Sequence, residues 1–330
     1  MKFRTLGSSG LVVSPVCLGT MTFGNPVKEE DSIKLVRQAM DLGVNFIDTS
    51  NTYEGYDRVL GSSGGTAEEI LGKALKDCRD KVVLATKIGS PLGDGPQDLG
   101  LTATLIGRDI DSCLRRLQTD YLDLLYFHWP DPETPLETSL GAMETAVRQG
   151  KVRCFAVSNF WAHDICEMLW LADKGVGPRV ACSQIPYSLL KRDYHNDLSF
   201  CQRHNIAVTP YRVLEGGALS GKYRRDVTPP KGSRAQEKPQ WMPEMDDSLF
   251  DILDATQALA DEAGVHISQY TLAWTLAQPA ITSLVLGAKR IEQIKDAVIA
   301  SDIQLTSEIL EKQDAITPPP WSNSVPFKRT

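Results

Sequence analysis

The sequence lacks several features that would mark a membrane-spanning, secreted or metal-binding protein. No stretch approaches the roughly 20 consecutive apolar residues that a membrane-spanning helix requires. The N-terminal segment has no apolar centre of the kind that a signal peptide carries. The seven cysteines contain no C-x-x-C pair, which argues against a zinc ribbon or a disulfide framework. An H-E-x-x-H motif is also absent, so we predict no metal site. The odd number of cysteines fits a reducing compartment, which predicts a cytoplasmic location.

Other features that the sequence lacks restrict the kinds of molecule that the protein can bind. Acidic residues outnumber basic ones by 42 to 35, and the net charge of −7 argues against non-specific binding to nucleic acid. No G-x-G-x-x-G motif follows a strand-like segment, which excludes the usual dinucleotide-binding turn of a Rossmann fold. The chain does have enough apolar residues, 42%, to form a core. We therefore expect a globular protein that binds small molecules rather than nucleic acid or a membrane, with homo-oligomerisation left open.

Short apolar segments alternate with helical patterns along the chain. Regular alternation of this kind predicts a parallel sheet. Eight such units in 330 residues fit a (β/α)8 TIM barrel of class α/β, as a single domain over residues 1–330, and a doubly wound open sheet is the alternative. Two segments before the first helix, 2–7 and 11–14, predict an N-terminal β-hairpin that caps the barrel. The predicted strands end at Gly19, Asp48, Lys87, His128, Asn159, Gln184, Tyr211 and Gly287.

The helical segments have signals of their own. Thr66 and Glu69 have the spacing of a capping box at a helix start. The longest irregular stretch, 215–247, is rich in glycine, proline and charge, which is typical of a functional lid. Helices are predicted near 31–43, 66–75, 104–117, 140–150, 161–172, 198–204, 249–263 and 268–277.

Polar side chains at the strand ends predict an active site, because barrel enzymes place their chemistry at that rim. Asp48 and Lys87 end neighbouring strands, and Tyr53 follows Asp48. An ammonium lowers the pKa of an adjacent phenol, so Tyr53 is predicted to be a general acid or base, with Asp48 holding Lys87 charged. His128 is expected to orient a carbonyl oxygen. Taken singly, these residues also have ordinary explanations as a turn cap, a solvated lysine and a packed core histidine.

If Tyr53 protonates a carbonyl oxygen, a second molecule must deliver an electron pair to the carbonyl group. A nicotinamide, which delivers a hydride, is one candidate. Ser158, Asn159 and Gln184 suit a carboxamide, and Tyr211 offers a ring for stacking. Lys289 and Arg290 suit a 2′-phosphate, so we prefer NADP(H), with NAD(H) still possible; the alternative is that both are solvated charges. An aromatic substrate pocket is predicted from Phe23, Trp129 and Trp321, and ordinary packing is the alternative.

These residues lie in a series of motifs that resembles the aldo-keto reductase superfamily along nearly the whole chain. The motifs are L-G-T-M at 18–21, F-I-D-T-S-N-T-Y ending at Tyr53, A-T-K ending at Lys87, F-H-W-P-D-P around His128, V-S-N-F at 157–160, S-Q-I-P-Y around Gln184 and G-A-L-S-G-K-Y ending at Tyr223. The likeness is strongest to the bacterial branch that also resembles potassium-channel β subunits. It implies a barrel and NAD(P)H-dependent carbonyl reduction, with Asp48, Tyr53, Lys87 and His128 as a catalytic tetrad and Tyr53 as proton donor.

The resemblance also implies a set of cofactor contacts. Two departures from the family pattern affect this set. Arg212-Val213-Leu214 replaces the usual S-P-L, so Arg212 is expected to meet either pyrophosphate or an anionic substrate. Asp296-Ala297 replaces Glu-Asn, which removes one adenine hydrogen bond. The implied contacts are Gly19, Thr20, Met21, Ser158, Asn159, Gln184, Tyr211, Arg212, Val213, Leu214, Gly216, Ser220, Lys222, Arg234, Gly287, Lys289, Gln293 and Asp296.

Two other functions remain as alternatives at this point. One is a Schiff-base aldolase with Lys87 as nucleophile, although a lysine paired with Asp48 stays charged and is then a poor nucleophile. The other is a non-catalytic NADP(H)-binding sensor or regulatory subunit. The substrate and the physiological direction cannot be read from the sequence.

Overall fold

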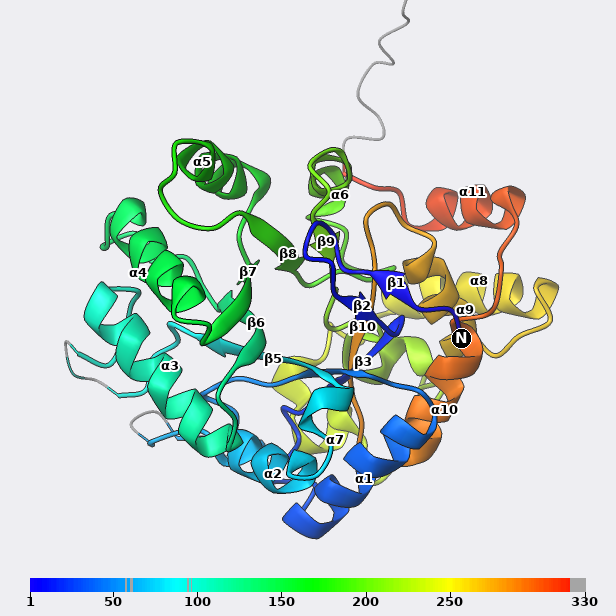
Figure 1. Cartoon of the computed structure of the whole chain (residues 1–330). Helices are drawn as coiled ribbons and strands as arrows, with labels where there is room; N and C mark the ends of the chain where they lie inside the picture. The colour runs from blue at the N-terminus through cyan, green and yellow to red at the C-terminus, as the bar shows by residue number, and fades with distance from the viewer. Residues whose placement is uncertain (57, 60–61, 94, 96, 321–330) are drawn as a thin grey trace, which may run out of the picture.

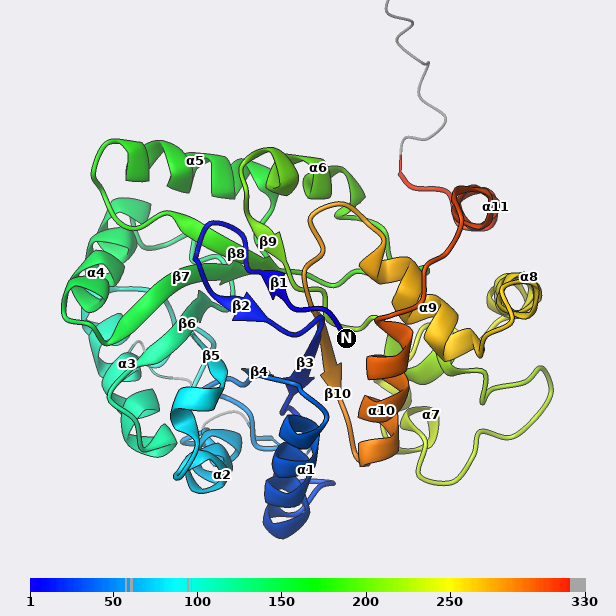
Figure 2. The same cartoon turned by 45° about the vertical axis from the view of Figure 1, so that its right-hand side comes forward.

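A curled sheet of eight parallel strands forms the centre of the protein. The computed structural model describes residues 1–56, 58–59, 62–93, 95 and 97–320. The strand order is β10-β3-β4-β5-β6-β7-β8-β9, and helices lie around the outside (Figures 1 and 2). The strands are β3 (Val16–Gly19), β4 (Phe46–Asp48), β5 (Val83–Ile88), β6 (Leu122–Phe127), β7 (Val152–Ser158), β8 (Val180–Gln184), β9 (Ala207–Val208) and β10 (Leu284–Gly287).

Backbone hydrogen bonds also join the two ends of this sheet. Val208 N–H donates to Ala280 O, and Thr282 N–H donates to Val208 O, both at 2.9 Å. Val285 N–H donates to Pro210 O, again at 2.9 Å. The curled parallel sheet is therefore consistent with the predicted (β/α)8 barrel, and its strands all end at one rim.

Each helix predicted from the sequence is present, but the described residues form three more, the first of which is the short α7 within the stretch predicted to be irregular. Helices α10 and α11 follow the last strand and were not predicted. No helix in the described part of the chain is long and apolar enough to cross a bilayer. The helices are α1 (Glu29–Asp41), α2 (Thr66–Leu75), α3 (Ala103–Leu117), α4 (Leu136–Arg148), α5 (Ala162–Asp173), α6 (His195–Arg203), α7 (Arg234–Glu237), α8 (Asp247–Glu262), α9 (Ile267–Leu276), α10 (Ile291–Ala300) and α11 (Ser307–Ile316), with 3-10 turns at η1 (Arg79–Lys81), η2 (Glu215–Ser220) and η3 (Pro239–Trp241).

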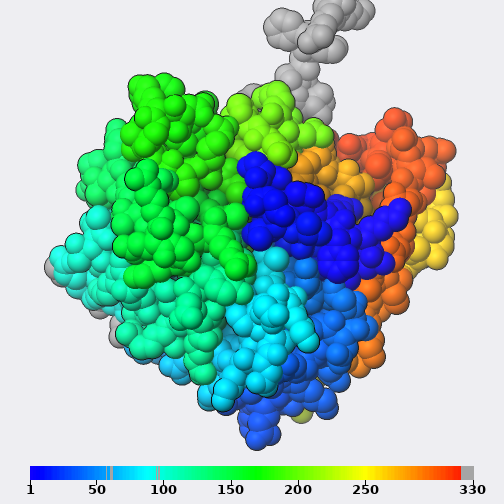
Figure 3. All heavy atoms as spheres, viewed as in Figure 1, coloured from blue at the N-terminus to red at the C-terminus, as the bar shows by residue number. Residues whose placement is uncertain are grey.

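The predicted N-terminal hairpin is present and covers the end of the sheet opposite the candidate site. Strands β1 (Arg4–Thr5) and β2 (Val12–Val13) are antiparallel. Leu6 and Val13 are fully buried against the residues inside the sheet. The hairpin, in dark blue, lies across the middle of the face shown in Figure 3. Gly7 has φ 53°, and a Cβ there would lie 2.4 Å from Ala181 O, so only glycine fits this contact.

Two local predictions differ from the structure. Strand β9 covers only Ala207–Val208 instead of extending to Tyr211, because Pro210 has no N–H to continue a ladder. Thr66 is the first helical residue of α2 rather than its cap. Gly65, in a left-handed conformation with φ 85°, precedes it, and no side chain caps the helix. The capping-box prediction is therefore wrong.

Candidate active site

Asp48, at the end of β4, and Lys87, in β5, form a buried ion pair at the C-terminal rim. Lys87 Nζ lies 2.5 Å from Asp48 Oδ1, and the side chains are 0% and 1% exposed. Lys87 Nζ also donates to Thr49 O at 2.8 Å and to Tyr53 OH at 3.4 Å. Gln184 Nε2 donates to Asp48 Oδ2 at 2.9 Å. All three ammonium hydrogens have acceptors, which fixes Nζ beside the Tyr53 phenol.

The pKa values of Lys87 and Tyr53 are both raised, for different reasons. Burial lowers the pKa of Lys87, but Asp48 and Tyr53 outweigh this effect, so the ammonium holds its proton more tightly than usual. Burial raises the pKa of Tyr53, and Lys87 offsets only part of that rise. The expectation of a lowered Tyr53 pKa is therefore wrong, because desolvation is the larger effect. Tyr53 is a protonated phenol at neutral pH, which is the form that can donate a proton.

His128 directly follows β6 and faces Tyr53. The two ring centroids are 6.2 Å apart in an edge-on arrangement. His128 Nδ1 lies 2.8 Å from Ser90 Oγ and 3.3 Å from Ser50 Oγ. Burial, assisted by Lys87 and Arg58, holds the pKa of His128 well below its ordinary value. If a serine hydroxyl donates to Nδ1, the neutral ring carries its proton on Nε2 and can donate from there.

The lowered pKa of His128 predicts a neutral imidazole down to mildly acidic pH. In the unfolded chain a histidine binds a proton near pH 6.5. The native state does not, so the free energy of unfolding should fall as the pH drops below that value. An NMR titration of the imidazole, assigned with the variant His128→Gln, measures this directly. A His128 signal that titrates at the ordinary pKa would contradict the prediction.

A second hydrogen-bonded group joins the ends of β7 and β9. Asn159 follows β7 with φ 66°, a left-handed conformation that asparagine tolerates. Its Nδ2 donates to His128 O at 2.9 Å and to Ser158 Oγ at 3.1 Å. Tyr211 OH donates to Asn159 Oδ1 at 2.7 Å. The side chains predicted to meet a nicotinamide therefore lie directly beside the predicted tetrad.

The loop after β3 is also tied to this site. The backbone N–H of Thr20 donates to Asp48 O at 3.0 Å, and Thr20 Oγ1 donates to the same oxygen at 3.1 Å. Gly19 pairs in register with Asp48. Met21 follows them and is partly exposed. The predicted contacts at 19–21 thus lie next to the ion pair.

Arg212 has its own counter-charge. Its Nε donates to Glu215 Oε2 at 3.0 Å, and Nη2 donates to Trp241 O at 3.1 Å. Ser188 Oγ donates to the other Glu215 oxygen at 2.9 Å. Arg212 has φ 59°, and its side chain is 40% exposed. The guanidinium is thus positioned at the rim, with Glu215 balancing its charge.

A cavity of about 520 Å³ opens beside Asn159 and Tyr211. Trp161 and Tyr194 stack in its wall with ring centroids 3.9 Å apart. Trp129, predicted for the substrate pocket, lines the cavity and stacks on His128 at 5.7 Å. The cavity is lined by Trp129, Asn159, Trp161, Pro186, Lys191, Asp193, Tyr194 and Tyr211.

The other two predicted pocket residues do not line this cavity. Phe23 is fully buried and packs in the core between the sheet and the helices. Its position just after β3 turns the ring inward, where burial of its apolar surface is favourable. Trp321 lies outside the described residues.

The remaining predicted cofactor contacts are spread over the stretch 213–222 and the start of α10. Val213 is buried, so its side chain is not available to contact a ligand from solvent. Ser220 Oγ donates to Gly217 O at 2.6 Å, and Lys222 Nζ lies 5.1 Å from the Tyr223 ring centroid. Leu214 and Gly216 are partly exposed in this stretch.

At the start of α10, Gln293 acts as a helix cap. Gln293 Oε1 accepts hydrogen bonds from the backbone N–H of Lys289 at 2.8 Å and of Arg290 at 3.1 Å. Gly287 and Asp296 are exposed on either side of this turn. The backbone before α10 is therefore held in place while the Lys289 side chain extends from it.

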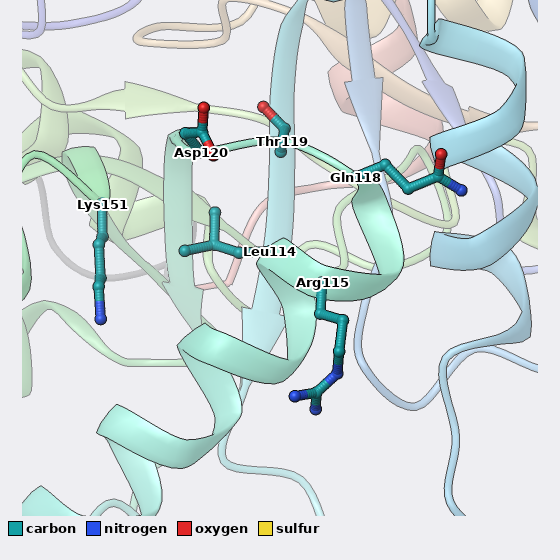
Figure 4. Close-up of a pocket in the computed structure, with 6 residues that line it drawn as sticks. All are labelled: Leu114, Arg115, Gln118, Thr119, Asp120 and Lys151. Atoms are coloured by element: carbon teal, nitrogen blue, oxygen red, sulfur yellow. The ribbon is translucent and has the colours of Figure 1, made fainter.

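A second hollow, of about 410 Å³, lies away from these residues. It is lined by Leu114, Arg115, Gln118, Thr119, Asp120 and Lys151 (Figure 4). Asp120 and Lys151 precede β6 and β7, so this hollow is at the N-terminal ends of the strands. It takes no part in the candidate site. The described residues contain no cluster of three or more side chains suited to hold a metal ion.

Several residues of the site were missed by sequence reasoning. Ser90 follows β5 by two positions and contacts His128, so the strand-end rule could have found it. Trp161 follows the V-S-N-F motif directly and could have been identified in the same way. Tyr194 carries no such signal, because its position in the cavity wall depends on a contact with Trp161 in a different part of the chain.

Comparison with known proteins agrees with this arrangement. A model of the Aldo/keto reductase family matches residues 15–318. The chain is 34% identical over 328 residues to "Uncharacterized oxidoreductase YrpG" of Bacillus subtilis (strain 168), covering 97% of each chain. It is 32% identical over 330 residues to "Probable voltage-gated potassium channel subunit beta" of Arabidopsis thaliana, covering 96% of each. It is 30% identical over 340 residues to "Protein tas" of Escherichia coli (strain K12), covering 96% of this chain and 97% of the relative.

Proposed function

Because the chain belongs to the aldo/keto reductase family of NAD(P)H-dependent oxidoreductases, we propose that it reduces an aldehyde or ketone to an alcohol, with NADPH as the preferred hydride donor. The observation that carries this proposal is the buried Asp48–Lys87 pair, whose Nζ lies 3.4 Å from the Tyr53 phenol. We further propose that the eight-stranded sheet is a closed barrel and that residues 1–330 form one domain.

Proton transfer is assigned to Tyr53. When bound, the reduced nicotinamide supplies a hydride to the carbonyl carbon. The Tyr53 hydroxyl then donates its proton to the carbonyl oxygen, so one hydride and one proton give the alcohol. Lys87 stabilises the tyrosinate that results, and a proton from solvent restores the phenol. His128 is neutral and can orient the carbonyl oxygen by donating from Nε2.

The residues present fit a dinucleotide. Tyr211 and Asn159 line the cavity and suit a nicotinamide ring and its carboxamide, with Ser158 and Gln184 beside them. Arg234 and Lys289 are cations that suit phosphate groups. Measuring consumption of NADPH and of NADH with a panel of aldehydes and ketones tests the assignment. Absence of turnover with every carbonyl compound would contradict it.

We also propose that the cavity wall favours aromatic carbonyl compounds. Trp161 is 40% exposed and stacks on Tyr194, so its removal should not disturb the core. Trp161→Ala should raise the KM for an aromatic aldehyde about tenfold, because an aromatic ring contact worth about 0.5–1.5 kcal/mol is lost together with some apolar burial. The KM for a short aliphatic aldehyde should hardly change.

Trp170→Ala is a matched control for this prediction. Trp170 lies on α5 and is 54% exposed, but it does not line the cavity. Steady-state kinetics with both aldehydes gives the comparison. Equal changes in KM for the aromatic and the aliphatic substrate would show that Trp161 does not form the substrate wall.

The two alternative functions make different predictions. An aldolase would need a neutral Lys87 amine, whereas Asp48 and Tyr53 together outweigh burial and raise the pKa of this group. A non-catalytic sensor is suggested by relatives named as potassium channel β subunits. Its signature would be tight nucleotide binding without turnover of any carbonyl compound. The complete tetrad favours the reductase.

A further inference from the structure

Three segments of the chain meet around Lys289. Its Nζ lies 2.5 Å from Glu237 Oε2 and 3.3 Å from Gly232 O, and these two residues belong to α7 and the loop before it. The same Nζ lies 5.3 Å from the centroid of the Tyr56 ring. The Lys289 and Glu237 side chains are 29% and 31% exposed. The ion pair is therefore accessible to a ligand from solvent.

Arg234 belongs to the same patch but is held differently. Its guanidinium carbon lies 4.4 Å from the Tyr56 ring centroid and 5.1 Å from that of Trp241. Aromatic faces hold a guanidinium without neutralising its charge. Arg234 is thus held by aromatic rings, whereas the charge of Lys289 is balanced by the Glu237 carboxylate.

We propose that Glu237 is a specificity-determining residue that limits the preference for NADP(H) over NAD(H). The inference rests on the proposed function, in which Arg234 and Lys289 meet phosphate groups, and it assigns the 2′-phosphate of the adenosine ribose to Lys289. A 2′-phosphate would compete with the Glu237 carboxylate for the Lys289 ammonium, and the two anions would repel each other. The ribose of NAD(H) has a hydroxyl at that position, and an acidic side chain is a usual acceptor for it. Glu237 therefore disfavours the binding of NADP(H) and suits the binding of NAD(H).

The variant Glu237→Gln tests this role because it removes the charge and keeps the size of the side chain. The dissociation constants of NADP⁺ and NAD⁺ would be measured by calorimetry on the full chain, without a carbonyl substrate. Quenching of tryptophan fluorescence gives a second readout, since Trp241 lies in the patch. We expect NADP⁺ to bind about tenfold more tightly and NAD⁺ to bind equally or more weakly.

Two further variants distinguish the effect of the Glu237–Lys289 contact from a general effect of net charge. Glu244→Gln changes the net charge equally, at an exposed position in the same stretch of chain, and should leave the ratio of the two constants unchanged. In a Lys289→Met background, Glu237→Gln should change the ratio much less, because the cation for which the anions compete is gone.

The outcomes distinguish the inference from the function on which it rests. Equal effects of Glu237→Gln on both nucleotides, or no effect, would overturn the role of Glu237 while nucleotide binding by the wild type still supports a reductase. The same change in Glu244→Gln would also overturn it, since net charge alone would then explain the result. Failure of the wild type to bind either nucleotide would overturn both proposals.

Discussion

Replacing Tyr53 with phenylalanine should slow carbonyl reduction by about 10²–10⁴-fold, the usual contribution of a positioned general acid. The variant keeps the ring and loses only the hydroxyl that lies 3.4 Å from Lys87 Nζ. Nucleotide binding should be largely unchanged, because the predicted nucleotide contacts lie on other residues. The rate is best measured in a single turnover, and the dissociation constant by calorimetry, so that chemistry and binding are separated.

Tyr126→Phe is the matched control for this variant. The Tyr126 ring also lies near Lys87, at 5.7 Å from Nζ. Its hydroxyl, however, contacts Cys182 and Thr209 inside the sheet. This variant should retain nearly the full rate. Turnover near that of the wild type in Tyr53→Phe would remove Tyr53 as the proton donor.

Replacing Lys87 with methionine should have the largest effect on stability. Asp48 is 1% exposed and would lose its counter-charge, and an unpaired buried charge costs about 3–5 kcal/mol. Among the described residues, Gln184 alone would remain as a donor to the carboxylate. Turnover should be lost as well, because the ammonium beside Tyr53 is removed. Urea unfolding measures the first effect, and NADPH consumption measures the second.

The double variant Asp48→Asn/Lys87→Met separates these two effects. It removes both buried charges together, so most of the lost stability should return. Turnover should stay lost, because nothing then stabilises the tyrosinate. A Lys87→Met protein as stable as the wild type would contradict the importance of the buried pair. Recovery of turnover in the double variant would contradict the assigned role of Lys87.

The alternation of strands and helices was visible in the sequence because each repeat buries one apolar segment and one apolar helix face. The same regularity located the rim, and with it the contact of Lys87 with Asp48 and Tyr53. Helices α10 and α11 were missed, although Thr306 caps α11 by accepting a hydrogen bond from Ile309 N–H. No strand follows either helix, so the alternation that identified the others gave no signal there.

The predictions about the site that failed have two causes. Some depend on opposing effects on a pKa, and others depend on contacts between residues that are distant in the sequence. The pKa of Tyr53 depends on burial as well as on Lys87, and burial could not be read from the spacing of residues. Phe23 follows β3 as Trp129 follows β6, yet one ring packs in the core and the other lines the cavity. The pairing of Lys289 with Glu237 joins residues 52 positions apart.

The most direct test of the proposed reaction is to follow the transferred hydrogen. The protein would be given an aromatic aldehyde and NADPH that carries deuterium at the reactive position of the nicotinamide. We expect an alcohol with one deuterium on the former carbonyl carbon and none on oxygen after exchange with water, which Tyr53→Phe forms about 10²–10⁴-fold more slowly than the wild type. An alcohol without deuterium, or none at all while NADPH binds, would contradict hydride transfer by this site.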